Sequence, residues 1–173
     1  MSTTSFPQRK SPRLQGYDYR QNGAYFITIC THKRQHLFGE ISSDEMELNT
    51  LGCIAQTCWE QIPAHFPKAE VDAFVVMPNH IHGVLLIIDE TKRADYQYEQ
   101  FSNPIARSLS TMMRSYKSAV TKQINQLLMT DNSPTWQGRF HDHIIRSERG
   151  LNVLRQYVAN NPVRWQVDRF YNL

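Results

Sequence analysis

The sequence predicts an α+β fold in which helices pack on an antiparallel sheet. Segments rich in β-branched and aromatic residues, typical of strands, are interleaved with segments whose apolar residues recur at helical spacing. Their order lacks the regular βαβ alternation of a parallel sheet. The chain has 173 residues, of which 40% are hydrophobic and 20% charged. This length and balance suit a single globular domain.

The main strands are expected where β-branched and aromatic residues gather, at residues 24–31, 71–77 and 80–88. The second and third flank a turn at Pro78 and Asn79 and form the most apolar stretch of the chain. Because the third is apolar on both faces beyond His82, we expect it to be a central strand covered on both sides. A shorter strand is predicted over residues 139–146.

Helices are expected where apolar residues recur every three or four positions, at residues 50–65, 104–128 and 148–161. Pro63 and Pro67 follow the apolar stripe of the first, and Pro162 stops the last. The middle helix has the longest stripe, formed by Ile105, Leu109, Met112, Met113, Tyr116, Val120, Ile124 and Leu127.

The remaining segments define the domain organisation. Residues 1–15 are polar and basic and are predicted to be a flexible arm, which leaves residues 16–173 as the single domain. Loops are predicted over residues 89–103 and 129–138. No apolar run approaches the length of a membrane span, so we expect no membrane partner. Three cysteines without a C-x-x-C pair indicate reduced thiols in a cytoplasmic protein.

The formal net charge is only +3, but arginine and lysine gather at both ends of the chain. Arginine suits phosphate contacts, although scattered arginines also simply solvate a surface. The basic residues at the two ends are Arg9, Lys10, Arg13 and Arg20, and then Arg139, Arg146, Arg149, Arg155, Arg164 and Arg169.

A pair of histidines begins the most apolar predicted strand. Because side chains alternate across a strand, His80 and His82 project from one face and Ile81 from the other. Two such imidazoles can converge on one metal ion, and their position just after a turn leaves the ion open to solvent. Gly83 allows a backbone or ligand to approach closely. An isolated H-x-H pattern is weak, and a third ligand must come from elsewhere.

A second histidine pair competes with the first. His141 and His143 have the same spacing, with Asp142 between them, in a polar segment near Arg139 and Arg146. We interpret this segment as a surface strand near bound phosphate, although spacing alone leaves it open as a ligand set.

The last predicted helix places a phenol and an amide together. Tyr157 lies at the edge of its apolar stripe, and Asn161 lies one turn later on the same face. An amide oxygen is an acceptable ligand for a hard divalent ion. Periodicity does not single out Tyr157, which could simply pack its ring in the core. Tyr116 is a rival, but its place within the apolar stripe indicates a core residue.

These segments together resemble a known family. Val-Val-Met-Pro-Asn-His-Ile-His-Gly-Val, residues 75–84, resembles the HUH motif of single-tyrosine transposases. Trp-Gln-Gly-Arg-Phe-His-Asp-His-Ile-Ile-Arg, residues 136–146, and Tyr-Val-Ala-Asn-Asn-Pro-Val, residues 157–163, resemble their REP-associated branch, as does Tyr-Phe-Ile-Thr at 25–28. The resemblance runs from about Arg13 to Trp165.

The resemblance implies a ferredoxin-like HUH endonuclease core and a set of functional residues. His80 and His82 would ligate Mg²⁺ or Mn²⁺, Asn161 would complete the metal site, and Tyr157 would be the nucleophile. Ala159 stands where many members carry a second tyrosine, so a relay of two tyrosines within this helix is not expected.

It also implies the reaction and its partner. The family cleaves and rejoins single-stranded DNA beside REP-like hairpins through a 5′-phosphotyrosine intermediate, as a monomer or as a homodimer that exchanges the tyrosine helix. We therefore expect a cytoplasmic, nucleoid-associated DNA-binding protein. The candidate DNA contacts are Arg9, Lys10, Arg13, Trp136, Arg139 and Arg146, whereas Phe140 is expected in the core.

Three other functions are compatible with parts of the pattern. A replication initiator or relaxase would use the same chemistry at an origin. A transposase relic would bind hairpin DNA without cleaving it. A small metal hydrolase would use both histidine pairs, His80 with His82 and His141 with His143, and would not need Tyr157.

Overall fold

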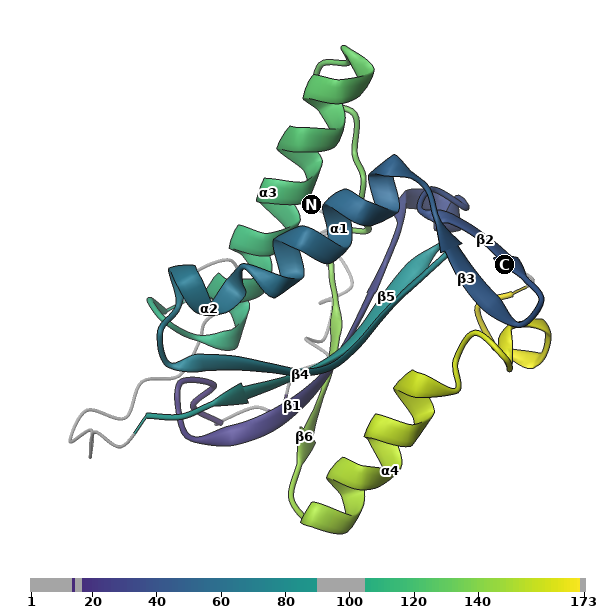
Figure 1. The fold of residues 1–173 in the computed structure, drawn as a ribbon. Helices are drawn as coiled ribbons and strands as arrows, with labels where there is room; N and C mark the ends of the chain where they lie inside the picture. The colour runs from purple at the N-terminus through teal and green to yellow at the C-terminus, as the bar shows by residue number, and fades with distance from the viewer. Residues whose placement is uncertain (1–13, 15–16, 90–104, 172–173) are drawn as a thin grey trace, which may run out of the picture.

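The computed structural model describes residue 14 and residues 17–89 and 105–171, and these fold into one α+β unit (Figure 1). Its main sheet has four strands in the order β4-β5-β1-β6, and all neighbours are antiparallel. The predicted fold class is therefore confirmed. The strands are β1 (Gly23–Cys30), β4 (Ala69–Met77), β5 (His80–Ile87) and β6 (His141–Ile145).

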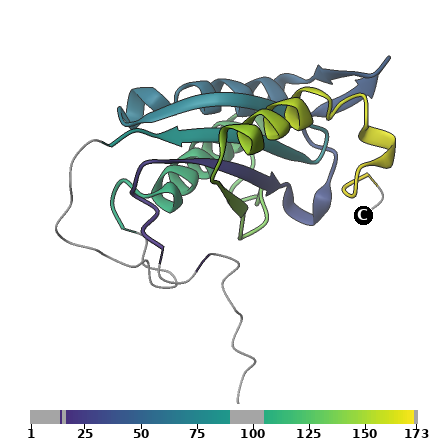
Figure 2. The same cartoon turned by 90° about the horizontal axis from the view of Figure 1, so that it is seen from below.

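The helices cover the two faces of this sheet unequally. Three of them lie on one face: α1 (Thr50–Glu60), α2 (Ile62–His65) and α3 (Leu109–Leu128). The fourth, α4 (Glu148–Ala159), crosses the other face alone, as Figures 1 and 2 show. Among the described residues, no helix combines the length and the apolar character needed to cross a membrane.

The larger part of the hydrophobic core lies between the sheet and the helices α1 and α3. Trp59 of α1 stacks on Phe74 of β4 with ring centroids 4.6 Å apart, and it meets the Tyr116 ring of α3 edge-on at 5.4 Å. Gly83 makes this packing possible, because a Cβ built there would lie 2.3 Å from Trp59 Cζ2. The close approach predicted at Gly83 is therefore made by the indole ring, on the face opposite the histidines.

The strand β5 is central, as its sequence predicts. It pairs with β1 on one side, where His82 faces Thr28 and His80 faces Cys30. It pairs with β4 on the other side, and the register of that pair shifts between Val71 and Phe74, which marks a β-bulge.

Several boundaries differ from those predicted. The long helix begins at Leu109 rather than at residue 104, because the Ser108 hydroxyl caps it and Arg107 has a left-handed φ of 64°. The segment 50–65 breaks into α1 and α2 at Gln61, two residues before Pro63. The last helix ends at Ala159 rather than at residue 161.

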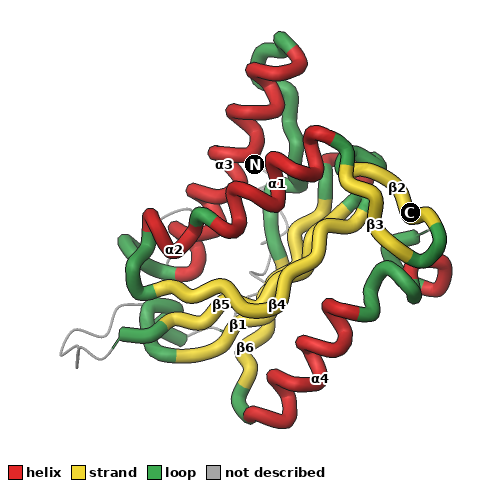
Figure 3. The backbone as a smooth tube through the Cα atoms, viewed as in Figure 1, coloured by secondary structure: helices red, strands yellow, loops and turns green. Residues whose placement is uncertain are grey.

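A small hairpin was not predicted. It consists of β2 (Gly39–Ser42) and β3 (Glu45–Leu48), and it is the separate pair of strands near the C-terminus in Figure 3. Its two turn residues, Ser43 and Asp44, both have positive φ, as a two-residue hairpin turn requires. The predicted arm at residues 1–15 lies outside the described residues apart from Leu14, and the predicted loop at 89–103 lies outside them apart from Asp89.

Candidate functional site: a buried histidine pair beneath a tyrosine helix

His80 and His82 project side by side from β5 toward α4, as strand alternation predicts. Their ring centroids are 4.5 Å apart, and neither side chain is exposed to solvent. The predicted opening to solvent is therefore wrong for this structure. The physical reason is the chain beyond α4, which folds back over the rings.

The residues around His80 fix which of its nitrogens carries the proton. The amide nitrogen of Asn79 donates to the Phe170 carbonyl over 2.9 Å, which turns Asn79 Oδ1 toward His80 Nδ1 at 2.8 Å. An amide oxygen only accepts, so Nδ1 of His80 donates the proton and Nε2 keeps its lone pair. An outer hydrogen bond of this kind orients a histidine for metal binding.

The second histidine is oriented in a similar way. Its Nδ1 lies 2.8 Å from the Thr28 hydroxyl of the neighbouring strand, which leaves Nε2 directed at α4. Burial lowers the pKa of His80 to about 2, with a further contribution from His82. Burial likewise lowers the pKa of His82 to about 3. Both rings are therefore neutral at physiological pH, which is the form that ligates metals.

Tyr157 of α4 meets this pair. Its hydroxyl lies 3.3 Å from His82 Nε2, and its ring packs 5.2 Å from the His82 ring and 5.9 Å from Phe26. Burial raises the pKa of the phenol above its ordinary value, and the charge of Asp168 raises it further. The tyrosine and the histidine motif, 75 positions apart in the sequence, thus form one site.

Two oxygen-bearing side chains complete the cluster. Asn161, which is only 1% exposed, directs its amide nitrogen at Asp168 Oδ2 over 3.5 Å. The same carboxylate oxygen lies 3.5 Å from the Tyr157 hydroxyl. The ligand atoms of His80, His82 and Asp168 lie within 4.8 Å of one another.

Sequence reasoning missed Asp168. It stands after the last helix in a stretch of mixed polar and apolar residues, with no spacing that relates it to the histidines. The backbone brings it there, because the chain turns through a short 3-10 helix, Trp165–Val167, directly before it.

This donor set fits a divalent cation. His80 Nε2 and Asn161 Oδ1 are buried atoms with no hydrogen-bond partner among the described residues, and both present lone pairs. Buried acceptors without donors are costly unless a cation or a hydrogen bond satisfies them. Together with the Asp168 carboxylate and His82, they form a mixed nitrogen and oxygen set such as divalent metals use.

Aromatic residues of the C-terminal segment cover the set. Phe170 packs on His80 with ring centroids 4.5 Å apart and on His82 at 5.8 Å, and Trp165 lies 5.9 Å from His80. The guanidinium groups of Arg34 and Arg169 each stack 4.5 Å from the centre of the Phe170 ring. The site is thus closed on its outer side and ringed by positive charge.

The second histidine pair lies elsewhere. His141 and His143 are exposed on β6, which pairs with β1 on the side away from β5. Within the part of the chain that the structure describes, the potential ligand atoms that converge belong to His80, His82 and Asp168. The geometry therefore does not bring the four histidines of the hydrolase hypothesis together.

The candidate DNA contacts separate into three groups. Arg139 and Arg146 are exposed, whereas Arg9, Lys10 and Arg13 lie outside the described residues. Trp136 was wrongly predicted as a stacking platform. It is 6% exposed and packs between Phe38, at 5.1 Å, and Tyr116, at 5.8 Å.

Burial bears on two further expectations, for Phe140 and Tyr116, and on one of the basic residues, Arg20. Phe140 lies in the core as predicted. Tyr116 also lies in the core and donates its hydroxyl to the Ala55 carbonyl over 3.1 Å, which removes it as a rival nucleophile. Arg20 is buried against Asp18 and is not available to DNA in this structure.

Comparison with known sequences finds relatives in Haemophilus influenzae. An uncharacterized protein of Haemophilus influenzae is 37% identical over 169 residues, which cover 94% of this chain and 93% of the relative. A second Haemophilus influenzae protein, named "Putative REP-associated tyrosine transposase", is 24% identical over 147 residues, 85% of this chain and 74% of that protein. This chain is homologous to the REP-associated tyrosine transposases.

Solved structures agree with this family. The structure described as a REP-associated tyrosine transposase bound to a REP hairpin aligns with a TM-score of 0.57 at 20% identity, over 92% of this chain and 74% of that one. A putative transposase from Deinococcus radiodurans aligns with a TM-score of 0.50 at 14% identity, over 86% and 95%. These likenesses show that the transposase fold is shared. No protein-family model matches the chain.

Proposed function

We propose that this REP-associated transposase cleaves and rejoins single-stranded DNA beside REP-like hairpins, with Tyr157 as the nucleophile. The observation that carries the proposal is the position of the Tyr157 hydroxyl, 3.3 Å from His82 Nε2 and 3.5 Å from Asp168 Oδ2. These contacts place the phenol beside two neutral imidazoles and a carboxylate, which are the groups that would hold a divalent ion next to a reacting tyrosine.

The reaction exchanges one phosphate ester bond for another and removes a proton from the phenol. The phenol oxygen loses its proton and attacks the scissile phosphorus, the bond from phosphorus to the 3′ oxygen breaks, and the departing 3′ oxygen takes up a proton from solvent, so that a 5′-phosphotyrosine and a free 3′-hydroxyl result. Asp168 Oδ2 is the carboxylate oxygen positioned to accept the phenol proton. Because the phosphotyrosine is itself a phosphodiester, a 3′-hydroxyl can reverse the step and join a different strand.

The cofactor in this proposal is Mg²⁺ or Mn²⁺. His80, His82 and Asp168 would hold it, with Asn161 beside them. When bound, the ion would withdraw charge from the phosphate and lower the pKa of the nearby phenol. The chain contributes the fixed orientation of both imidazoles, through Asn79 and Thr28, so the ligand lone pairs are set before the ion arrives.

The proposal requires the C-terminal cover to move. Phe170 and Trp165 lie against the histidine rings, so a phosphate reaches the site only when this segment shifts outward. Its displacement would uncover Arg34, which is partly buried against Phe170, and the guanidinium groups of Arg34 and of the exposed Arg169 both suit phosphate contacts.

The proposed substrate follows from the family and from the surface. A relative of the same fold was solved with a REP hairpin, and we propose a similar palindrome with a single-stranded flank for this chain. Arg139 and Arg146, exposed at the two ends of β6, are the described candidates for backbone contacts.

The test is a covalent trap. The protein is incubated with a labelled hairpin oligonucleotide that carries a single-stranded flank, in Mn²⁺ or in EDTA, and is resolved under denaturing conditions. We expect an adduct with the wild type in Mn²⁺ and none with EDTA or with Tyr157→Phe, while hairpin binding persists. Tyr171→Phe, at an exposed tyrosine beside Trp165, is the matched control and should retain the adduct. Binding without any adduct would support a non-catalytic hairpin-binding protein instead.

A further inference from the structure

An ion pair fastens the tyrosine helix to the sheet at a distance from the metal ligands. The Arg155 guanidinium of α4 donates two hydrogen bonds to the Asp72 carboxylate of β4, from Nε to Oδ1 over 2.8 Å and from Nη2 to Oδ2 over 2.6 Å. Arg155 Nη1 also donates to Asn152 Oδ1, one turn earlier, over 3.0 Å. A parallel, two-bond contact of this kind defines direction as well as distance.

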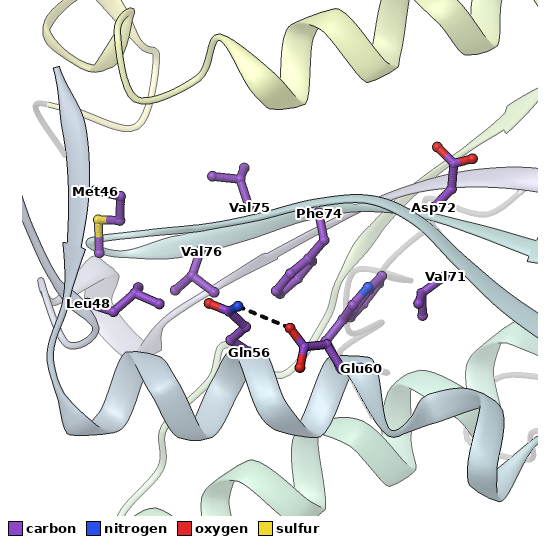
Figure 4. A pocket seen from close by; sticks show the side chains of 10 residues that line it. Met46, Leu48, Gln56, Glu60, Val71, Asp72, Phe74, Val75 and Val76 are labelled. Carbon is purple, nitrogen blue, oxygen red and sulfur yellow. Dashed lines mark hydrogen bonds between the residues drawn. The ribbon is translucent and has the colours of Figure 1, made fainter.

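The β-bulge in β4 turns Asp72 toward α4. Val71 pairs with Leu85 and Phe74 pairs with Gly83, so Asp72 and Ala73 together face the single residue Val84. Figure 4 shows Asp72 and Val75 pointing from β4 toward α4, whereas Phe74 and Val76 point toward α1. Without the extra residue, Asp72 would share the face of Phe74, which packs against Trp59 in the core.

Apolar packing alone holds α4 only weakly. Within this helix, all of which the structure describes, Val158 is the one buried residue, and Val153 is 58% exposed. The Asp72 side chain is only 15% exposed, compared with 43% for that of Arg155. The carboxylate is thus partly shielded from water, which strengthens its attraction to the guanidinium relative to a fully exposed pair.

The position of Arg155 along α4 gives the contact a specific effect. Arg155 and Tyr157 are two residues apart, about 200° around the helix axis, so they flank the face that Val158 buries from opposite sides. A roll of the helix that carries the Tyr157 hydroxyl away from His82 therefore has to move Arg155 in the opposite sense, which disrupts its two-bond contact with Asp72.

We propose that Asp72 and Arg155 are positioning residues that set the roll of α4 and thereby hold Tyr157 against the histidine pair of its own chain. This inference rests on the proposed function, because it assigns the pair a role in presenting the nucleophile. It adds a second, remote determinant of the reaction that neither touches DNA nor binds the metal.

The test compares single-turnover adduct formation at saturating hairpin DNA. Asp72→Asn and Arg155→Gln should each slow adduct formation about three- to tenfold, with the Kd for the hairpin unchanged within about twofold. The reversed pair, Asp72→Arg with Arg155→Asp, should recover much of the loss. Lys68→Gln is the control, since it breaks the ion pair of Lys68 with Asp89 away from α4 and should leave the rate unchanged.

A second measurement is independent of DNA cleavage. Amide hydrogen exchange should accelerate in α4 of Asp72→Asn and stay unchanged in α3. Unaltered adduct rates in both single variants would overturn the positioning role, whether or not exchange changes. If the wild type forms no adduct, the proposed function fails, and exchange in α4 alone decides whether this pair fixes the helix.

Discussion

The Tyr157 hydroxyl lies 3.3 Å from Nε2 of His82, although the two residues are 75 positions apart in the sequence. Three elements create this proximity. The strand β5 aims the imidazole at α4, the Thr28 hydroxyl holds its other nitrogen, and α4 crosses the sheet face that carries the histidines. The contact joins the histidine motif that would bind the metal to the tyrosine that would attack phosphorus.

Asp168 is expected to be a ligand of the ion and to supply the negative charge that the neutral Asn161 amide lacks. Asp168→Asn should weaken Mn²⁺ binding by about tenfold or more, because it removes the one negative charge among the converging ligand atoms. Isothermal titration of the DNA-free protein with Mn²⁺ measures this directly. Asp131→Asn, at an exposed loop residue, is the control. Equal affinities for the wild type and Asp168→Asn would remove Asp168 from the site.

The metal-free protein should lose stability on mild acidification. In the unfolded chain, histidine titrates near ~6.5, whereas the folded pKa values of His80 and His82 are about 2 and about 3. Between these limits the unfolded state binds protons that the folded state does not bind. The free energy of unfolding therefore rises with pH through this window and falls as pH drops below ~6.5.

Urea unfolding in EDTA between about pH 7 and 5 measures how the free energy of unfolding changes with pH. At the acid end, its slope should correspond to about two more protons bound by the unfolded chain than by the folded chain. His82→Gln should reduce it by about one proton, because it removes one of the two buried neutral imidazoles. A slope in His82→Gln equal to that of the wild type would show that His82 is not the buried neutral group described here.

Adding a side chain at Gly83 should destabilise the fold. Gly83→Ala places a methyl group 2.3 Å from Trp59 Cζ2, in a ring that is stacked on Phe74 and cannot withdraw freely. We expect a loss of about 1–3 kcal/mol in the free energy of unfolding, typical of an overpacked core. Gly138→Ala, where no atom lies within 4 Å of the added Cβ, should change it by less than about 0.5 kcal/mol. Chemical denaturation measures the free energy of unfolding of both variants.

The sequence predicts those parts of the site that depend on local periodicity. Alternation along β5 places His80 and His82 on one face, and helical spacing places Tyr157 and Asn161 one turn apart. The histidine arrangement occurs in the structure. The helix ends at Ala159, before Asn161, yet the Asn161 amide and the Tyr157 hydroxyl still meet at the same oxygen of Asp168. The central position of β5 also follows from its own composition, because both faces of the strand need cover.

Features that depend on long-range contacts could not be predicted. Asp168 enters the site through a turn of the C-terminal segment, and no periodic pattern relates that segment to β5. Trp136 was misassigned for a similar reason. Its proline- and glycine-flanked context indicates an exposed loop, yet its backbone pairs with Thr31, and its ring is buried between Phe38 and Tyr116.

The central claim is that Tyr157 carries the DNA after cleavage, and peptide mapping of the trapped adduct tests it most directly. Trypsin should cleave after Arg155 and Arg164, so Tyr157 is the single tyrosine of the fragment 156–164. Mass spectrometry after nuclease digestion should find the nucleotide phosphate on that fragment. A nucleotide attached to a fragment with a different tyrosine, or to a residue other than tyrosine, would contradict the account.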